Sequence, residues 1–298
     1  MTVERGDVFG YLGPNGAGKT TSMRMMLGLI RPTEGTARLF GRDPQESIDA
    51  LEGVAGFVEA PRFYPYLDGR TNLKLLAALD GNDAASLVEE VLEVVELSDR
   101  GRDRVGGYSH GMRQRLGIAA SLLRRPKLLM LDEPATGLDP AGMRDMRRLV
   151  RRLADDGMTV LLSSHLLAEV EELCNRVAII RKGSVVYEGK LADLRLAAGL
   201  SYRLRTTDDL VARRIVSEQD GIEEVRDTPD GRIAFHPADE QVVAKLSGRL
   251  AEAGALIIEL APREATLEEL FFDLTEDDAD AADEARVSQA IDTIEGSP

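Results

Sequence analysis

The stretch Gly13-Pro14-Asn15-Gly16-Ala17-Gly18-Lys19-Thr20 decides the fold of this chain. It fits the pattern GxxxxGK[ST], and it separates an apolar run over residues 7–12 from a helical pattern over residues 19–29. Glycines in such a loop let successive backbone N–H groups turn inward around a phosphate. Lys19 then reaches the phosphate oxygens, and the Thr20 hydroxyl, followed by Thr21, can ligate Mg²⁺ at the start of a helix. The sequence therefore predicts a phosphate loop that binds a nucleoside triphosphate.

Two acids follow a second apolar run, residues 127–131. In an open α/β sheet, ligands bind at the carboxyl ends of the strands, so Asp132 is predicted to hold Mg²⁺ through water. Glu133 is predicted to polarise the attacking water. Taken alone, the pair fits a surface cap equally well.

One of only three histidines, His165, follows a third apolar run over residues 158–163. A lone histidine is usually structural. At the carboxyl end of a strand in this sheet, however, it is predicted to reach the γ-phosphate as a hydrogen-bond donor.

The strand and helix patterns alternate along the first two thirds of the chain, with a helix at 139–153 between the last two strands. This order predicts a mainly parallel, three-layer α/β core. The pattern over residues 71–124 predicts a helical insertion, residues 177–187 a hairpin, and residues 191–198 a helix.

A different pattern begins near Ser201. Strands are predicted at 202–205, 222–227, 232–236 and 256–260, with helices at 208–217 and 238–253, in the βαββαβ order of a ferredoxin-like domain. A helix at 267–274 follows, and the acidic block that begins at Thr275 predicts a disordered tail.

Composition narrows the functional class. The net charge of −15 argues against binding to nucleic acid, and no apolar run approaches the about 18 residues needed to span a bilayer. The first residues lack a secretory signal, and the single Cys174 excludes an intrachain disulfide, so a cytoplasmic protein is expected.

A fourth element is Tyr108-Ser109-His110-Gly111-Met112-Arg113-Gln114-Arg115. Ser109 and Gly111 at a helix start expose N–H groups and a hydroxyl that suit a second phosphate-binding surface, although alone they describe only a capped helix. With the phosphate loop, Leu131-Asp132-Glu133-Pro134, Gly137-Leu138-Asp139-Pro140 and His165, the order of motifs resembles an ABC ATPase over residues 6 to about 190.

The resemblance implies a P-loop NTPase core over residues 1–198, with a helical subdomain at about 70–124. An accessory ferredoxin-like α+β domain at 201–275 and the acidic tail at 276–298 complete the expected domain organisation. The resemblance also implies that ATP and Mg²⁺ are the cofactors, that Glu133 is the general base and that His165 contacts the γ-phosphate.

The resemblance also implies partners. In a head-to-tail homodimer or heterodimer, Ser109 and Gly111 of one subunit close on the ATP held by Lys19 of the other, and Asp139 signals across the interface. ATP-driven closure moves a transmembrane permease, whose coupling helix contacts residues 59–75. The chain is then peripheral on the inner face of the membrane, and the permease selects the cargo.

Within the family, residues 57–65 and 267–271 resemble those of drug and peptide-antibiotic resistance exporters, including bacitracin and lantibiotic self-immunity pumps. Ordinary members carry glutamine where this chain has Glu59. An acid there could still ligate Mg²⁺ but adds negative charge near the γ-phosphate, which predicts slower or metal-sensitive turnover.

Twelve residues precede Gly13, whereas family members have about thirty before the strand of the phosphate loop, including edge strands and an aromatic residue that stacks on adenine. Tyr11 lies in that strand and is expected to be packed. We expect the natural gene product to be longer.

Other functions remain to be weighed. A small-molecule kinase needs neither Ser109 nor His165. A ribosomal ABC ATPase usually has two cassettes in one chain. A DNA-repair ABC ATPase has a long coiled coil between the phosphate loop and the signature. A regulatory nucleotide-binding module with little or no hydrolysis remains the alternative, because of the short start and Glu59.

Overall fold

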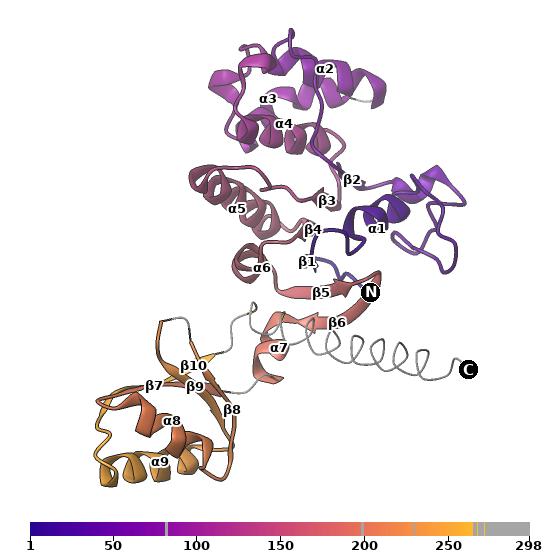
Figure 1. The fold of residues 1–298 in the computed structure, drawn as a ribbon. Helices are drawn as coiled ribbons and strands as arrows, with labels where there is room; N and C mark the ends of the chain where they lie inside the picture. The colour runs from indigo at the N-terminus through magenta and orange to yellow at the C-terminus, as the bar shows by residue number, and fades with distance from the viewer. Residues whose placement is uncertain (81–82, 198–199, 229, 265–266, 268–270, 272–298) are drawn as a thin grey trace, which may run out of the picture. The chain divides into compact units, whose positions relative to one another are not determined.

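The computed structural model describes residues 1–80, 83–197, 200–228, 230–264, 267 and 271 (Figure 1). They form two compact units, one spanning Met1–Leu191 and the other beginning at Ala192. Each unit has its own sheet and its own apolar core. No helix in the described ranges combines the length and the apolar composition needed to cross a membrane.

The first unit is built on a six-stranded sheet in the order β2-β3-β4-β1-β5-β6. Its strands are β1 (Val8–Leu12), β2 (Val54–Phe57), β3 (Leu128–Asp132), β4 (Thr159–Ser164), β5 (Arg176–Arg181) and β6 (Ser184–Lys190). The first five strands in the spatial order pair in parallel, and β6 runs antiparallel to β5. Every residue of β1, β3 and β4 is buried, which explains why these central strands read as continuous apolar runs.

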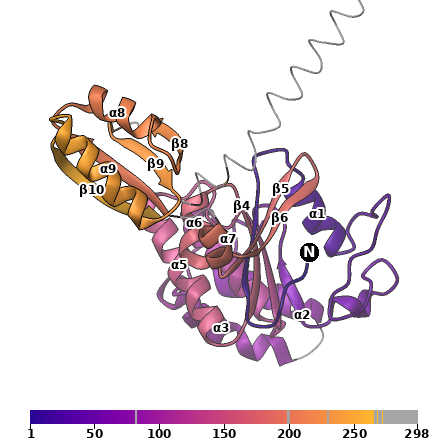
Figure 2. The same cartoon turned by 90° about the horizontal axis from the view of Figure 1, so that it is seen from below.

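Helices cover both faces of this sheet (Figure 2). On one face, Met23 of α1 (Lys19–Met26) packs with Phe9 and Tyr11 of β1. On the other face, Gly10 lies so close to α6 (Leu167–Leu173) that a Cβ on it would stand 2.8 Å from Val170. The amphipathic helix α5 (Pro140–Asp155) packs against β4 and α6. The predicted three-layer α/β core is confirmed.

Three helices gather at one end of the first unit: α2 (Gly69–Asp80), α3 (Val88–Val94) and α4 (His110–Leu122) (Figure 1). Short 3₁₀ turns surround them or precede them in the chain, namely Ile48–Leu51, Asp83–Leu87, Ser98–Arg100 and Val105–Gly107. The region predicted as a helical insertion is therefore helical. The sequence interpretation missed the strand β2, which contains a glycine and only four residues.

The predicted hairpin over residues 177–187 corresponds to β5 and β6. Its turn uses Lys182 and Gly183, with φ angles of 47° and 83°, as a two-residue hairpin turn requires. The next helix, α7, spans Leu191–Ala197.

The second unit has a four-stranded antiparallel sheet in the order β10-β7-β9-β8. Its elements are β7 (Leu200–Thr206), α8 (Asp209–Ser217), β8 (Ile222–Asp227), β9 (Ile233–Pro237), α9 (Glu240–Glu252) and β10 (Ile257–Glu264). Leu204 and Phe235 of the sheet pack against Ile215 of α8 and Leu246 of α9, so both helices cover the same face. The predicted βαββαβ order is confirmed.

Three predictions fall largely or wholly outside the described residues. Of the helix expected at 267–274, only Leu267 and Phe271 are described, and Leu267 is fully buried. The acidic tail at 276–298 lies outside them, as do residues 198 and 199, where the first domain was expected to end.

Candidate nucleotide-binding site

The phosphate loop joins the end of β1 to the start of α1, as the sequence predicted. Gly18 caps α1 with a φ of 104°, a backbone conformation that other residues rarely adopt. Gly13 is required by space, because a Cβ there would stand 2.6 Å from the Ile180 carbonyl oxygen. The loop therefore needs glycine at Gly18 and at Gly13 for two different physical reasons.

The ammonium group of Lys19 is folded into the loop, and the side chain is 6% exposed. Its Nζ donates to the carbonyl oxygens of Gly13 at 2.7 Å and Pro14 at 3.2 Å. It also lies 3.2 Å from Glu133 Oε1. The Lys19 ammonium group is thus held in the loop by two carbonyl oxygens and a carboxylate, and phosphate oxygens can replace these partners.

The carboxylate of Asp132, at the end of β3, links the loop to the neighbouring strand. Its Oδ2 accepts from the Thr20 hydroxyl at 2.8 Å, and its Oδ1 accepts from the Ser163 hydroxyl at 2.5 Å. The parallel register pairs Asp132 with Ser163, which brings these groups to one sheet edge. A hydroxyl and a buried carboxylate side by side are hard oxygen donors of the kind that Mg²⁺ prefers, so these residues fit that ion.

Glu133 follows Asp132 with a left-handed φ of 50°, which turns its side chain toward the loop. Its Oε2 accepts from the Thr136 hydroxyl at 2.8 Å and lies 2.5 Å from His165 Nδ1. Burial raises the pKa of the Glu133 carboxyl, but the hydrogen bonds from Thr136 and His165 and the charge of Lys19 outweigh burial and leave that pKa below its ordinary value. Glu133 is therefore ionised at neutral pH and can accept a proton.

These groups surround a cavity of about 510 Å³. It is lined by Asn15, Gly16, Gly18, Lys19, Thr20, Thr21, Glu133, Thr136 and His165. The structure thus brings the phosphate loop, Glu133 and His165 together around one space. The sequence interpretation missed Thr136 and Ser163, because only the fold shows which acid each hydroxyl reaches.

A second cavity, of about 410 Å³, is lined by three other predicted residues, Ser109, Gly111 and Asp139. Ser109 caps α4, its Oγ accepting from the Met112 N–H at 3.2 Å, and Asp139 caps α5 by accepting from the Gly142 N–H at 2.9 Å. Both line this cavity together with Gly111, and Lys19 does not. His110 Nε2 lies 3.1 Å from the carbonyl oxygen of Thr136, which connects the walls of the two cavities.

Glu59 lines neither of these cavities. Its carboxylate forms an ion pair with Arg24 on the exposed side of α1, and its backbone has a φ of 72°. Its predicted role as a metal ligand stays a prediction.

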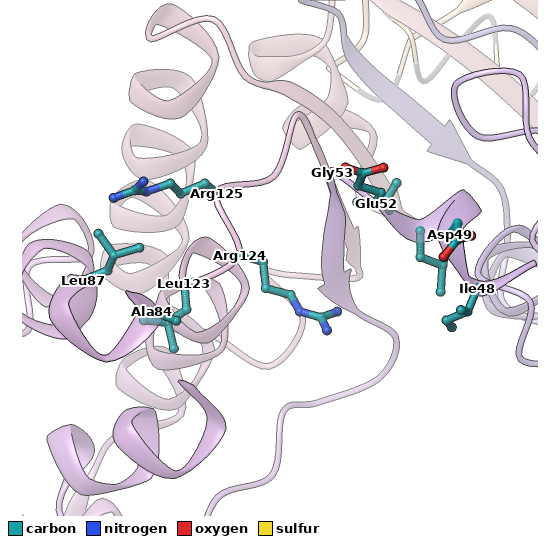
Figure 3. A pocket seen from close by; sticks show the side chains of 11 residues that line it. Ile48, Asp49, Glu52, Gly53, Ala84, Leu87, Leu123, Arg124 and Arg125 are labelled. Atoms are coloured by element: carbon teal, nitrogen blue, oxygen red, sulfur yellow. The ribbon is translucent and has the colours of Figure 1, made fainter. Parts of the chain in front are cut away.

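Figure 3 shows another cavity, of about 840 Å³. It is bounded by Glu52 and Gly53 before β2, by Ala84 and Leu87 in the helical region, and by Arg124 after α4. None of the predicted site residues lines it.

Comparison with known proteins agrees with this geometry. The family model described as ABC transporter matches residues 1–136. The chain is 38% identical to the bacitracin transport ATP-binding protein BcrA of Enterococcus faecalis, over 91% of this chain and 88% of that protein. It is 36% identical to the daunorubicin/doxorubicin resistance ATP-binding protein DrrA of Streptomyces peucetius, over 97% and 92% of the two chains.

A solved structure of an ATP-binding subunit of an ABC transporter also resembles the chain, with a TM-score of 0.58 and 29% identity. The match covers 66% of this chain and 84% of that one. Fold, motif geometry and relatives agree, and the chain therefore belongs to the ATP-binding proteins of the ABC transporter family.

Proposed function

We propose that this chain hydrolyses ATP and powers an exporter whose membrane pathway is a separate protein. The observation that carries the proposal is the carboxylate of Glu133, which stands between Lys19 of the phosphate loop and His165 at 3.2 and 2.5 Å. A base at this place lies beside the position that the γ-phosphate takes when the loop is filled.

The contacts of Lys19 and His165 suggest how bound ATP would free the Glu133 carboxylate for catalysis. Phosphate oxygens would replace the carbonyl groups of Gly13 and Pro14 and the carboxylate of Glu133 around Lys19. A proton on His165 Nδ1, now directed at Glu133, is available to a γ-phosphate oxygen once the ring turns. Both exchanges release Glu133 to accept a proton from the attacking water.

Thr20 and Asp132 are the residues that would hold Mg²⁺, with Ser163 fixing the Asp132 carboxylate. The bound ion would neutralise charge that develops on the phosphates. Glu59 would join these ligands only after leaving Arg24.

The separation of the two cavities supports a composite site made by two subunits. Ser109, Gly111 and Asp139 present a helix start and a hydroxyl, but they line a different cavity from Lys19 in the same chain. A second subunit, identical or related, would place these groups over the γ-phosphate.

An apolar surface near the predicted coupling region is the proposed contact with the permease. Tyr64 and Tyr66, 54% and 65% exposed, lie with ring centroids 5.7 Å apart. Asn72 of α2 holds this segment through the Tyr64 backbone, and Leu75 and Leu79, one turn apart on α2, are also exposed. The exposed apolar side chains support the proposal that this segment is a protein interface, and a permease contact here would place the chain on the inner face of the membrane.

The proposed cargo is a drug or a peptide antibiotic. The support is the similarity to proteins named for bacitracin transport and for daunorubicin resistance over nearly the whole chain. Export of bacitracin or daunorubicin from cells that carry this gene and its permease would test the cargo class.

Steady-state ATPase activity of the purified chain with Mg²⁺, compared with Glu133→Gln, tests the motor function. We expect the wild type to turn over, and the variant to be inactive but to dimerise on ATP in a size measurement. Binding of ATP by a wild type that does not hydrolyse it would instead support the alternative, a regulatory nucleotide-binding protein.

A further inference from the structure

A buried acid, Glu169, holds the turn that carries His165 and has no role in the mechanism above. Glu169 lies on α6 and is 3% exposed. Its Oε2 accepts from the Ser164 hydroxyl at 2.8 Å. Its Oε1 is buried, and no hydrogen-bond partner for it stands among the described residues. A half-satisfied buried carboxylate is costly, so its presence requires an explanation.

Ser164 connects Glu169 to the turn. Its Oγ accepts from the Leu166 N–H at 2.9 Å, so the hydroxyl bridges the residues on either side of His165. A hydroxyl has a single proton, and its donation to Glu169 directs its lone pairs toward Leu166. The Glu169 N–H also donates to the Leu166 carbonyl oxygen at 3.1 Å. Glu169 thus holds both ends of the turn, one through its side chain and one through its backbone.

The other side of the turn faces the reacting groups. His165 Nδ1 lies 2.5 Å from Glu133 Oε2. The two successive serines at the end of β4 bind different acids: Ser163 donates to Asp132, and Ser164 donates to Glu169. An unbroken set of contacts therefore leads from Glu169 through Ser164 and His165 to Glu133.

The charges around Glu169 come from several elements. Burial raises the pKa of the Glu169 carboxyl, opposed by the Ser164 hydrogen bond and the charge of Arg147 on α5, while the charge of Glu133 raises it further. The charge of His165 lowers the pKa of Glu169. Burial raises the pKa of the Cys174 thiol, and the charge of Glu169 raises it further. Arg147 also forms an ion pair with Glu172, so its positive charge is shared between two acids.

We propose that Glu169 is a positioning residue for ATP hydrolysis, which acts through Ser164 to fix the turn that presents His165 to Glu133 and to the γ-phosphate. The inference rests on the proposed ATPase function. A residue of this kind affects the rate of the chemical step more than the binding of ATP, because it touches neither the phosphate loop nor the nucleotide.

Two substitutions of Glu169 separate positioning from stability. Glu169→Leu removes the acceptor for Ser164, and we expect kcat to fall about 10- to 100-fold with little change in KM for ATP. Its melting temperature should hold or rise, since an apolar side chain of similar size replaces a poorly satisfied buried charge. Glu169→Gln retains an acceptor oxygen and should keep kcat near that of the wild type. Glu93→Gln, at an exposed position on α3, is the control.

A purely structural role for Glu169 predicts that melting temperature and kcat fall together, and that result, or an unchanged kcat in Glu169→Leu, overturns the proposal. Ser164→Ala should reproduce the defect, and the double variant should be no slower than either single variant, because both remove one contact. If Glu169→Leu does not fold, Ser164→Ala alone decides the kinetic question.

Imidazole nitrogen resonances of His165 in the nucleotide-free protein give a readout that needs no hydrolysis. We expect Glu169→Leu and Ser164→Ala to shift them, and Glu93→Gln to leave them in place. If the resonances shift but the wild-type chain does not hydrolyse ATP, the coupling between Glu169 and His165 is supported and the ATPase function is refuted. Unshifted resonances would refute the coupling and leave the ATPase function intact.

Discussion

The Glu133 carboxylate links catalysis to stability at the scale of a single residue. Its pKa in the folded chain lies below the ordinary value of 4.5, so the folded state favours the ionised form more than the unfolded state does. The stabilisation is therefore present above the ordinary pKa and is lost as the pH falls through the folded pKa.

Glu133→Gln mimics the protonated form, so we expect the wild type to melt at a higher temperature than this variant at about pH 7, and the gap to close on acidification. Thermal unfolding of both proteins across pH, without nucleotide, measures the gap. Glu93→Gln, at an exposed position on α3, is the control. A gap that is constant or widens in acid would show that the contacts with Lys19, Thr136 and His165 do not favour the ionised carboxyl.

Glu59 gives the second prediction at this scale. If its carboxylate approaches the γ-phosphate during turnover, its negative charge opposes that step, and Glu59→Gln should hydrolyse ATP faster with a changed Mg²⁺ dependence. Arg24→Gln separates this effect from loss of the ion pair, because it removes the pair and keeps the acid. An unchanged rate and Mg²⁺ dependence in Glu59→Gln would end the argument for a ligand role.

The residues of the site differ in how far sequence reveals them. The phosphate loop, Asp132, Glu133 and His165 could be found because each occupies the carboxyl end of an apolar strand. Thr136 and Ser163 escaped, since a hydroxyl in a loop or at a strand end carries no pattern until the register pairs it with an acid. Glu169 escaped because an acid on a helix is expected at the surface, and only burial distinguishes it.

At the scale of elements, the strand β2 depends on one close approach. A Cβ on Gly56 would stand 1.8 Å from the Met130 carbonyl oxygen of β3, and its φ is 156°. We expect Gly56→Ala to separate the two strands and to destabilise the chain by about 3 kcal/mol or more, measured by denaturant unfolding.

Gly248 on α9 is the matched control for Gly56, because no atom lies within 4 Å of a Cβ placed there. Gly248→Ala should leave stability unchanged or raise it by about 0.5–1 kcal/mol through helix propensity. Equal stability of Gly56→Ala and the wild type would mean that β2 is not held against β3 at this point.

The same glycine explains why this element was missed while others were predicted. Continuous apolar runs identify β1, β3 and β4 because these strands are buried on both faces. Alternation and a turn sequence identify the hairpin and the βαββαβ unit. A four-residue strand with a glycine at its third position offers neither signal, and only its pairing with β3 defines it.

At the scale of the whole molecule, the proposed composite site predicts that turnover needs two chains, because the residues proposed for it line two separate cavities in one chain. We expect Lys19→Ala to disable the half that contains the phosphate loop. We expect Gly111→Asp to disable the half that contains the start of α4, because it places a negative charge there. A Cβ at this position would be in ordinary contact, with its nearest atom on Leu138 at 3.6 Å.

In a homodimer, each variant alone should be inactive, because every composite site contains one damaged half. A mixture of the two should recover ATPase activity, since a mixed dimer joins the intact Lys19 of one chain to the intact Ser109 and Gly111 of the other. Titration of one variant into the other, with turnover and ATP-dependent size recorded together, measures the recovery.

If the mixture forms dimers on ATP and stays inactive, the two halves do not meet across the subunits in this way. If the mixture neither dimerises nor hydrolyses ATP while the wild type does both, each variant has damaged assembly itself. Recovered turnover requires the head-to-tail arrangement, because only that pairing places an intact phosphate loop opposite an intact helix start.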